Sequence, residues 1–158
     1  PDGSYLRSDA AALPFADASF DLVVFYNSLM DVDEMEGSVS EAARVLARGG
    51  HLCACVTHPT ADAGRFVSGE PDAAFVIEDT YLGPRRWFEM QTECDGLEMH
   101  FTGWAYPLEA YFKAMERAGL VVEALREPRV DDPTVLKDPS EERWRRVPMF
   151  LMWRAVKI

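Results

Sequence analysis

The chain has 158 residues and a formal net charge of −11, with 48% hydrophobic and 27% charged residues. This length suffices for one hydrophobic core, so we expect a single domain over residues 1–158. No apolar stretch approaches the ~20 residues of a membrane helix. The acidic net charge disfavours a nucleic acid as partner, because phosphate binding requires clustered Lys and Arg. The one basic run, Arg143, Arg145 and Arg146, is typical of a solvated face.

Cysteine usage and the first residues suggest where the protein works. Three cysteines, Cys53, Cys55 and Cys94, are too few for a disulfide scaffold, and no signal peptide precedes them. We therefore expect a cytoplasmic protein. Because the sequence begins with Pro1 rather than Met, we expect the domain to be incomplete at its N-terminus.

The first half of the chain alternates strand-like and helix-like segments. Tyr5 and Leu6 have the pattern of a strand end, and the apolar run Phe20 to Tyr26 predicts a buried strand. Apolar residues at helical spacing predict a helix from Ser38 to Arg48, ended by Gly49 and Gly50. His51 to Thr57 then predicts a second buried strand, so strand, helix and strand form a βαβ unit with parallel strands.

The second half continues this pattern after an interruption. A helix is predicted between Pro107 and Gly119, a strand over Leu120 to Leu125, and an antiparallel last strand over Met149 to Val156. Residues 59–106 read as an insertion, in which Asp95 and Gly96 join two β-like runs as a hairpin. Residues 128–142 are polar and proline-marked, which predicts a surface loop.

Four strings resemble class I S-adenosylmethionine (SAM) dependent methyltransferases of the type 11 kind. They are SDAAALPFADASFDLVV (8–24), EAARVLARGGHLCACV (41–56), EAYFKAMERAGLVVEALREPR (109–129) and WRRVPMFLMWRA (144–155). The resemblance covers most of the chain and implies the C-terminal portion of a Rossmann-like α/β sheet, with an antiparallel last strand and an inserted β-hairpin. It also implies SAM as cofactor and a small molecule as methyl acceptor.

The chain departs from the family at its front. The family's first strand leads into a G-x-G-x-G loop around the methionine part of SAM, yet none of the ten glycines here forms G-x-G. Gly49 and Gly50 do not substitute, because they are predicted to end a helix, whereas the cofactor needs a loop that ends a strand and opens a helix. Two strands and the main cofactor loop are therefore expected outside this chain.

The resemblance assigns cofactor contacts to two places. Asp9 and Ala10 stand where the family binds adenine, beside the apolar Leu13, and the strand end Phe25, Tyr26 and Asn27 would line the methionine part. For Asp9 the alternative is a turn cap, and for Phe25 it is the core.

Four metal-binding residue types raise the question of zinc: His51, Cys53, Cys55 and His58. The first three alternate along one strand face, ~6 to 7 Å apart in a row, and a row cannot converge on one ion. We therefore expect no metal and interpret Cys53 and Cys55 as buried core thiols.

The remaining site residues concern the acceptor. His58 follows a strand end, where it can act as the general base or merely cap the strand. Trp87, His100, Trp104 and Tyr106 lie in or beside the hairpin, which in the family builds the acceptor side; the alternative is cross-strand pairing.

These patterns leave two main hypotheses for function. The first is methyl transfer from SAM to a small-molecule acceptor. The second is a non-catalytic methyltransferase-like fragment that acts as an interaction or assembly module, and a nicotinamide oxidoreductase ranks third, because its glycines are absent too. In either case the unpaired flank of the sheet favours a homo-oligomer.

Overall fold

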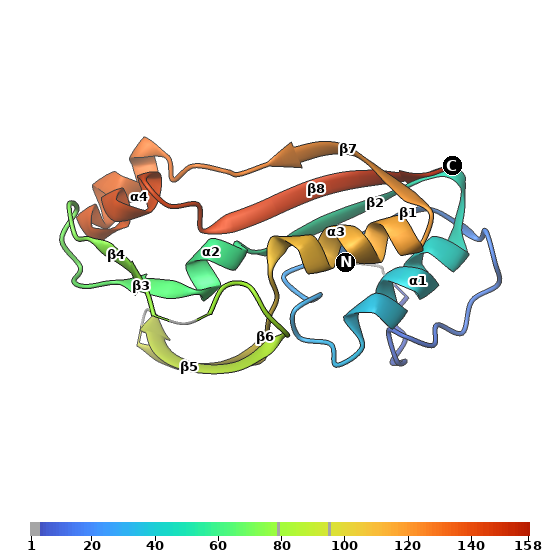
Figure 1. The fold of residues 1–158 in the computed structure, drawn as a ribbon, viewed down its shortest axis with the longest axis horizontal. Coiled ribbons are helices and arrows are strands. Elements are labelled where there is room, and N and C mark those ends of the chain that lie inside the picture. The colour runs from blue at the N-terminus through green and yellow to red at the C-terminus, as the bar shows by residue number, and fades with distance from the viewer. Residues whose placement is uncertain (1–3, 79, 95) are drawn as a thin grey trace.

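The computed structural model describes residues 4–78, 80–94 and 96–158 and is built on a four-stranded sheet. The strands follow the order β1-β2-β8-β7 across the sheet (Figure 1). Their bounds are β1 Phe20–Tyr26, β2 Leu46–Thr57, β7 Leu120–Arg126 and β8 Phe150–Lys157. β1 and β2 are parallel, whereas β8 lies antiparallel between β2 and β7. This is the expected mixed sheet with an antiparallel last strand.

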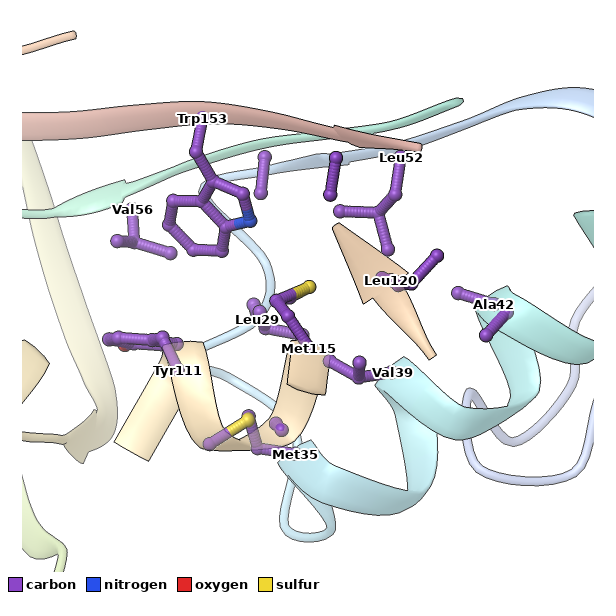
Figure 2. Close-up of a cluster of buried hydrophobic side chains, with 14 of the residues drawn as sticks. Leu29, Met35, Val39, Ala42, Leu52, Val56, Tyr111, Met115, Leu120 and Trp153 are labelled. Carbon is purple, nitrogen blue, oxygen red and sulfur yellow. The ribbon is translucent and has the colours of Figure 1, made fainter. Parts of the chain in front are cut away.

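Two helices cover one face of this sheet. α1 (Met35–Val45) connects β1 to β2, and α3 (Leu108–Arg117) precedes β7; both lie on the same side of the sheet (Figure 1). Figure 2 shows the core between them, where Trp153 of β8 and Tyr111 of α3 point into the same apolar layer. On the opposite face, Leu22, Val24 and Tyr26 of β1 are exposed.

Shorter elements fill the segment between β2 and α3. They are α2 (Pro59–Asp62), β3 (Gly64–Phe66), β4 (Phe75–Ile77), β5 (Arg86–Cys94) and β6 (Leu97–Ala105). β3 pairs with β4 and β5 pairs with β6, each antiparallel, and both hairpins lie at the end of the sheet where β2 finishes (Figure 1). The inserted hairpin is thus confirmed through the β5–β6 pairing, although Asp95 of its predicted turn lies outside the described residues.

The four predicted strands of the sheet are confirmed in position, but β1, expected to be buried, has only half-buried and exposed residues, and the helix boundary before β2 is wrong. α1 ends at Val45, and Leu46 already pairs with Phe20 of β1. The register then shifts, so that Leu22 pairs with His51 across an irregular stretch. Gly49 lies in this stretch with φ of +77°, a left-handed conformation that glycine adopts without a steric penalty. The glycine pair therefore shapes a bulge within β2 and does not stop a helix.

Three smaller expectations are also wrong. Tyr5 and Leu6 are exposed and form no strand, since the described structure offers no strand beside them. Residues 128–142 hold α4 (Asp132–Lys137) and most of the 3-10 helix η1 (Pro139–Arg145), because Asp131 and Asp138 cap backbone amides at their starts. Cys53 is half-buried on the face without helices, whereas Cys55 is buried.

Among the described residues, no helix is long and apolar enough to cross a membrane.

Candidate functional site

The ends of β1 and β2 place a set of polar groups at one edge of the sheet. Asn27 follows β1 with φ of +45°, and its backbone N–H donates to the Cys55 carbonyl at 2.9 Å. This left-handed turn, which Asn tolerates better than most residues, redirects the chain over the edge. The Asn27 Oδ1 atom is buried and has no hydrogen-bond partner among the described residues. An acceptor oxygen without a partner is costly in the free protein and is satisfied when a donor from a ligand binds.

His58 lies just past the end of β2 and is only 6% exposed. Its Nδ1 accepts the backbone N–H of Thr60 at 3.0 Å, which caps the first turn of α2. The hydrogen therefore resides on Nε2, which donates to Oε1 of Glu127 at 3.1 Å. Burial lowers the pKa of His58, although the Glu127 carboxylate opposes the shift. The imidazole is thus neutral with its one acceptor nitrogen engaged, and it can accept a proton only after Thr60 is released.

Asp62, one turn further along α2, is the second titratable group at this edge. Its Oδ2 accepts the Thr57 hydroxyl at 3.0 Å, and its backbone carbonyl accepts from the Arg86 guanidinium. Desolvation raises the pKa of Asp62 to about 6, against the opposing effects of the Thr57 hydrogen bond and the Arg86 charge. A carboxyl group with this pKa exchanges protons near neutral pH, as a general base requires.

Two tyrosines meet beside Asp62. The rings of Tyr106 and Tyr111 make an edge contact with centroids 5.5 Å apart, and Tyr111 is 1% exposed. The Tyr111 hydroxyl is buried, and no described residue forms a hydrogen bond with it. Burial raises the pKa of Tyr111, and the nearby Asp62 charge adds to the shift, so this hydroxyl stays protonated and can donate.

The base of the β5–β6 hairpin contacts the segments that follow the ends of β1 and β2. The backbone N–H of Trp104 donates to the Met30 carbonyl at 2.8 Å, and its indole Nε1 donates to Asp33 at 3.2 Å. Arg85 stacks over the Trp104 ring, 4.0 Å from its centroid. Because Arg86 in turn reaches Asp62 after β2, the hairpin base bridges the loops that follow β1 and β2. A cleft of about 350 Å³ opens beside it, lined by Asp33, Arg85 and Tyr106 among others.

The predicted adenine loop is held against α1. Glu41 accepts the Leu13 N–H at 2.8 Å, while Arg44 donates to the carbonyls of Leu13 and Phe15 at 2.9 and 2.8 Å. Glu41 and Arg44 also pair with each other at 2.7 Å, which lowers the pKa of Glu41 to about 2. Hydrogen bonds with Glu41 and Arg44 of α1 therefore hold this loop in place.

Asp9 at the start of this loop caps a turn and keeps one oxygen for a ligand. Its Oδ1 accepts the Ala11 N–H at 2.9 Å, and Oδ2 makes no hydrogen bond within the described residues. Ala11 packs against Gly37 in the first turns of α1, so closely that a Cβ added at Gly37 would lie 3.1 Å from the Cβ of Ala11. The Oδ1 contact is the turn cap that stands as the alternative for Asp9, and an adenine contact of Asp9 and the half-buried Ala10 remains a prediction. Nothing in the described residues replaces the glycine loop for the methionine part.

The structure separates the other predicted residues. Phe25 packs against the core, which is its alternative interpretation, and Tyr26 lies on the opposite, helix-free face. Trp87 and Trp104 pair across the hairpin with ring centroids 5.0 Å apart, and His100 is bound to Glu89 at 2.6 Å. These contacts favour cross-strand pairing for Trp87 and His100, while an acceptor role for any of the four remains a prediction.

Sequence reasoning missed Asp62 and Tyr111. One signal was present for Asp62, since a carboxylate four residues after His58 falls one helical turn away at the same strand end. Tyr111 falls within the helix predicted between Pro107 and Gly119, and nothing in its spacing indicates that the hydroxyl lacks a partner in the described structure.

Comparison with known proteins agrees with this architecture. Residues 2–54 match the family described as methyltransferase domain. A demethylmenaquinone methyltransferase of Renibacterium salmoninarum is 43% identical over 61 residues, which are 38% of this chain and 26% of that protein. The matched region is therefore about a quarter of the curated relative's length.

Solved structures extend the likeness to nearly the whole chain. A SAM-dependent methyltransferase from Mesorhizobium loti aligns with a TM-score of 0.75 at 23% identity, over 99% of this chain and 71% of that one. A putative SAM-dependent methyltransferase from Listeria monocytogenes aligns with a TM-score of 0.73 at 14% identity, over 98% and 69%. At these identities the likeness shows the fold.

Proposed function

Because the chain has the class I SAM-dependent methyltransferase fold, and its first third matches the methyltransferase domain family, we propose that it is the acceptor-side part of a SAM-dependent methyltransferase. The observation that supports this best is the edge where β1 and β2 end. Both strands are parallel, so Asn27, His58 and Asp62 lie at the carboxyl ends of the sheet, where open α/β folds bind their ligands.

Bound SAM supplies an activated methyl group, so the protein's task is to hold the acceptor in line and to remove a proton. Asp9 and Ala10 hold the adenine edge, in a loop that Glu41 and Arg44 fix to α1. The Tyr111 hydroxyl and Asn27 Oδ1, each buried without a hydrogen-bond partner within the described ranges, offer one donor and one acceptor for a polar ligand.

Proton removal falls to a residue that titrates at this edge. His58 was the first candidate, and its proton-accepting nitrogen is engaged by Thr60. Asp62 is the second, since its pKa of about 6 leaves it largely ionised at neutral pH. A positioning role for His58, through Glu127 and α2, accords best with its hydrogen bonds.

A small molecule is the acceptor class we propose. Its support is a cleft of about 350 Å³ beside the hairpin base, which lies in the usual range for small-ligand sites. The curated relative is a demethylmenaquinone methyltransferase, and the matched region does not extend to most of that protein. We therefore propose the class and not that acceptor.

The test uses the full-length protein encoded by the gene. We expect calorimetry to show SAM binding, and we expect transfer of a radiolabelled methyl group from SAM to a member of a small-molecule extract. Failure of the full-length protein to bind SAM would contradict the proposal and support the non-catalytic module. Binding without transfer in Asp62→Asn, with transfer retained in the exposed control Asp72→Asn, would identify the carboxylate that takes the proton.

A further inference from the structure

A second pocket lies at the same end of the sheet, between the end of β7 and η1. Its volume is about 260 Å³, and three arginines line it together with Trp144 and Glu127: Arg129, Arg145 and Arg146. Arg143 lies beside it, on the ring of Phe66. Four arginines thus gather within 18 residues of a chain whose Asp and Glu outnumber Lys and Arg by 27 to 16. The basic run does not form the plain solvated face that the sequence suggests.

The charges of these arginines are only partly neutralised by the protein. Arg145 pairs with Asp132 and with Glu142, the latter at 3.2 Å. Arg129, by contrast, makes no hydrogen bond or ion pair within the described residues, and the guanidinium group of Arg146 donates there only to the backbone carbonyl of Ala73. Two guanidinium groups at the pocket are therefore without a carboxylate partner in the described part of the chain.

The arginines beside Phe66 are held in place rather than freely mobile. The guanidinium groups of Arg143 and Arg146 lie 5.5 and 5.6 Å from the centroid of the Phe66 ring. Trp144 packs edge-on against the same ring at 4.9 Å. The Nε atom of Arg143 is buried and has no hydrogen-bond partner in the described part of the chain. Ordered guanidinium groups bind planar or tetrahedral oxyanions at little entropic cost, which makes this pocket suited to an anion.

Glu127 connects this pocket with the strand edge described above. It lines the pocket, and its Oε1 accepts from Nε2 of His58 at 3.1 Å. The backbone N–H of His58 also donates to the carbonyl of Met149, the residue directly before β8. The pocket is therefore one side chain away from the histidine at the end of β2, on the side where the acceptor would bind.

We propose that this pocket, with Arg129 and Arg146 as its principal cations and Trp144 as its wall, binds an anionic group of the methyl acceptor. The group is an oxyanion, a carboxylate or a phosphate. Anion binding stands on the pocket alone, whereas assigning the anion to the acceptor rests on the proposed function.

The first experiment titrates the protein with inorganic phosphate and, separately, with succinate. Arginine Nε–H signals in nitrogen-15 NMR spectra report the binding. We expect saturable shifts of the Arg129, Arg143 and Arg146 signals, weakened by added NaCl, and the tighter of the two probes indicates the source of the anion. In Arg129→Gln the affinity should fall at least about tenfold, the loss of one charge-assisted hydrogen bond.

Two matched variants make the result decisive. Arg129 makes no hydrogen bond or ion pair with the described residues, so its replacement removes none of these, and Arg129→Lys should recover part of the affinity because it restores the charge. Arg48→Gln removes the same charge at the opposite end of β2 and should bind both probes as the original protein does. Equal affinity in Arg129→Gln and in the original protein, or an equal loss in Arg48→Gln, would overturn the anion site.

The second experiment separates the anion site from the proposed function. The preferred probe should raise KM for the acceptor in the full-length protein and leave kcat unchanged. A probe that binds the pocket without competing with the acceptor overturns the assignment to the acceptor. The titrations use neither SAM nor methyl transfer, so a failed methyltransferase assay leaves their result standing.

Discussion

The buried carboxyl group of Asp62 should make the stability of this protein depend on pH in an unusual direction. Its pKa rises from 3.8 to about 6 in the folded chain, because desolvation outweighs the Thr57 hydrogen bond and the Arg86 charge. A raised acid pKa means that the folded state binds the proton more tightly than the unfolded state. The ionised side chain therefore costs stability, and the cost grows as the pH rises from about 4 to 6.

The size of this effect follows from the shift. About two pK units at 1.36 kcal/mol each give an upper limit of about 3 kcal/mol at pH 8, and below 1 kcal/mol at pH 4. Asp62→Asn removes the charge and retains an oxygen for the Thr57 hydroxyl. We expect this variant to be more stable than the original protein by about 1–3 kcal/mol at pH 8.

Urea unfolding followed by circular dichroism at pH 4, 6 and 8 measures the difference. The gap between variant and original protein should open as the pH rises, whereas Asp72→Asn, at an exposed carboxylate, should show a constant difference. A gap that stays the same from pH 4 to pH 8 would refute the reasoning. So would a variant that is less stable at pH 8, because the ionised carboxylate would then be stabilising.

Three further predictions concern the other parts of the site. Replacing His58 by Asn keeps an oxygen that can cap Thr60, whereas His58→Ala removes the cap. A positioning role predicts that methyl transfer falls only in His58→Ala. An equal loss in both variants, by ~10² to 10⁴, would instead show that His58 transfers the proton. In the full-length protein, Asp9→Ala should weaken SAM binding by about 1–3 kcal/mol in calorimetry, with little change of turnover at saturating SAM. Glu41→Ala removes the side chain that accepts the Leu13 N–H, so hydrogen exchange of that amide should become faster, and unchanged exchange would show that Arg44 alone fixes the loop.

The sequence permitted the sheet to be predicted because its strands are apolar runs rich in β-branched and aromatic residues, a pattern that marks β1 as a strand although none of its residues is buried in the described structure. Phe20 to Tyr26 was predicted to the residue. The end of α1 was not, because the helical spacing continues through Leu46, and only the pairing of Leu46 with Phe20 converts that residue into a strand.

The segment from 59 to 106 was predictable only where local signals are strong. The pairing of β5 with β6 follows from the alternation around its turn, whereas β3 and β4 have three residues each and depend on contacts such as that of Phe66 with Phe75. The site residues show the same contrast between local sequence patterns and contacts that form only in the folded chain. His58 was found through its place after a strand, but the protonation of Asp62 and the unpartnered Tyr111 hydroxyl depend on burial, which spacing does not specify.

The order of the sheet has a consequence for synthesis on the ribosome. β8 is made after the three other strands of this sheet, yet it lies between β2 and β7 and is the hydrogen-bonding partner of both. Until residue 157 has left the exit tunnel, β7 cannot join the other strands, and Trp153 is missing from the core against which Tyr111 packs. The nascent chain must therefore keep two separate halves with exposed apolar faces until translation of this segment ends, a period in which holding chaperones would have their largest effect.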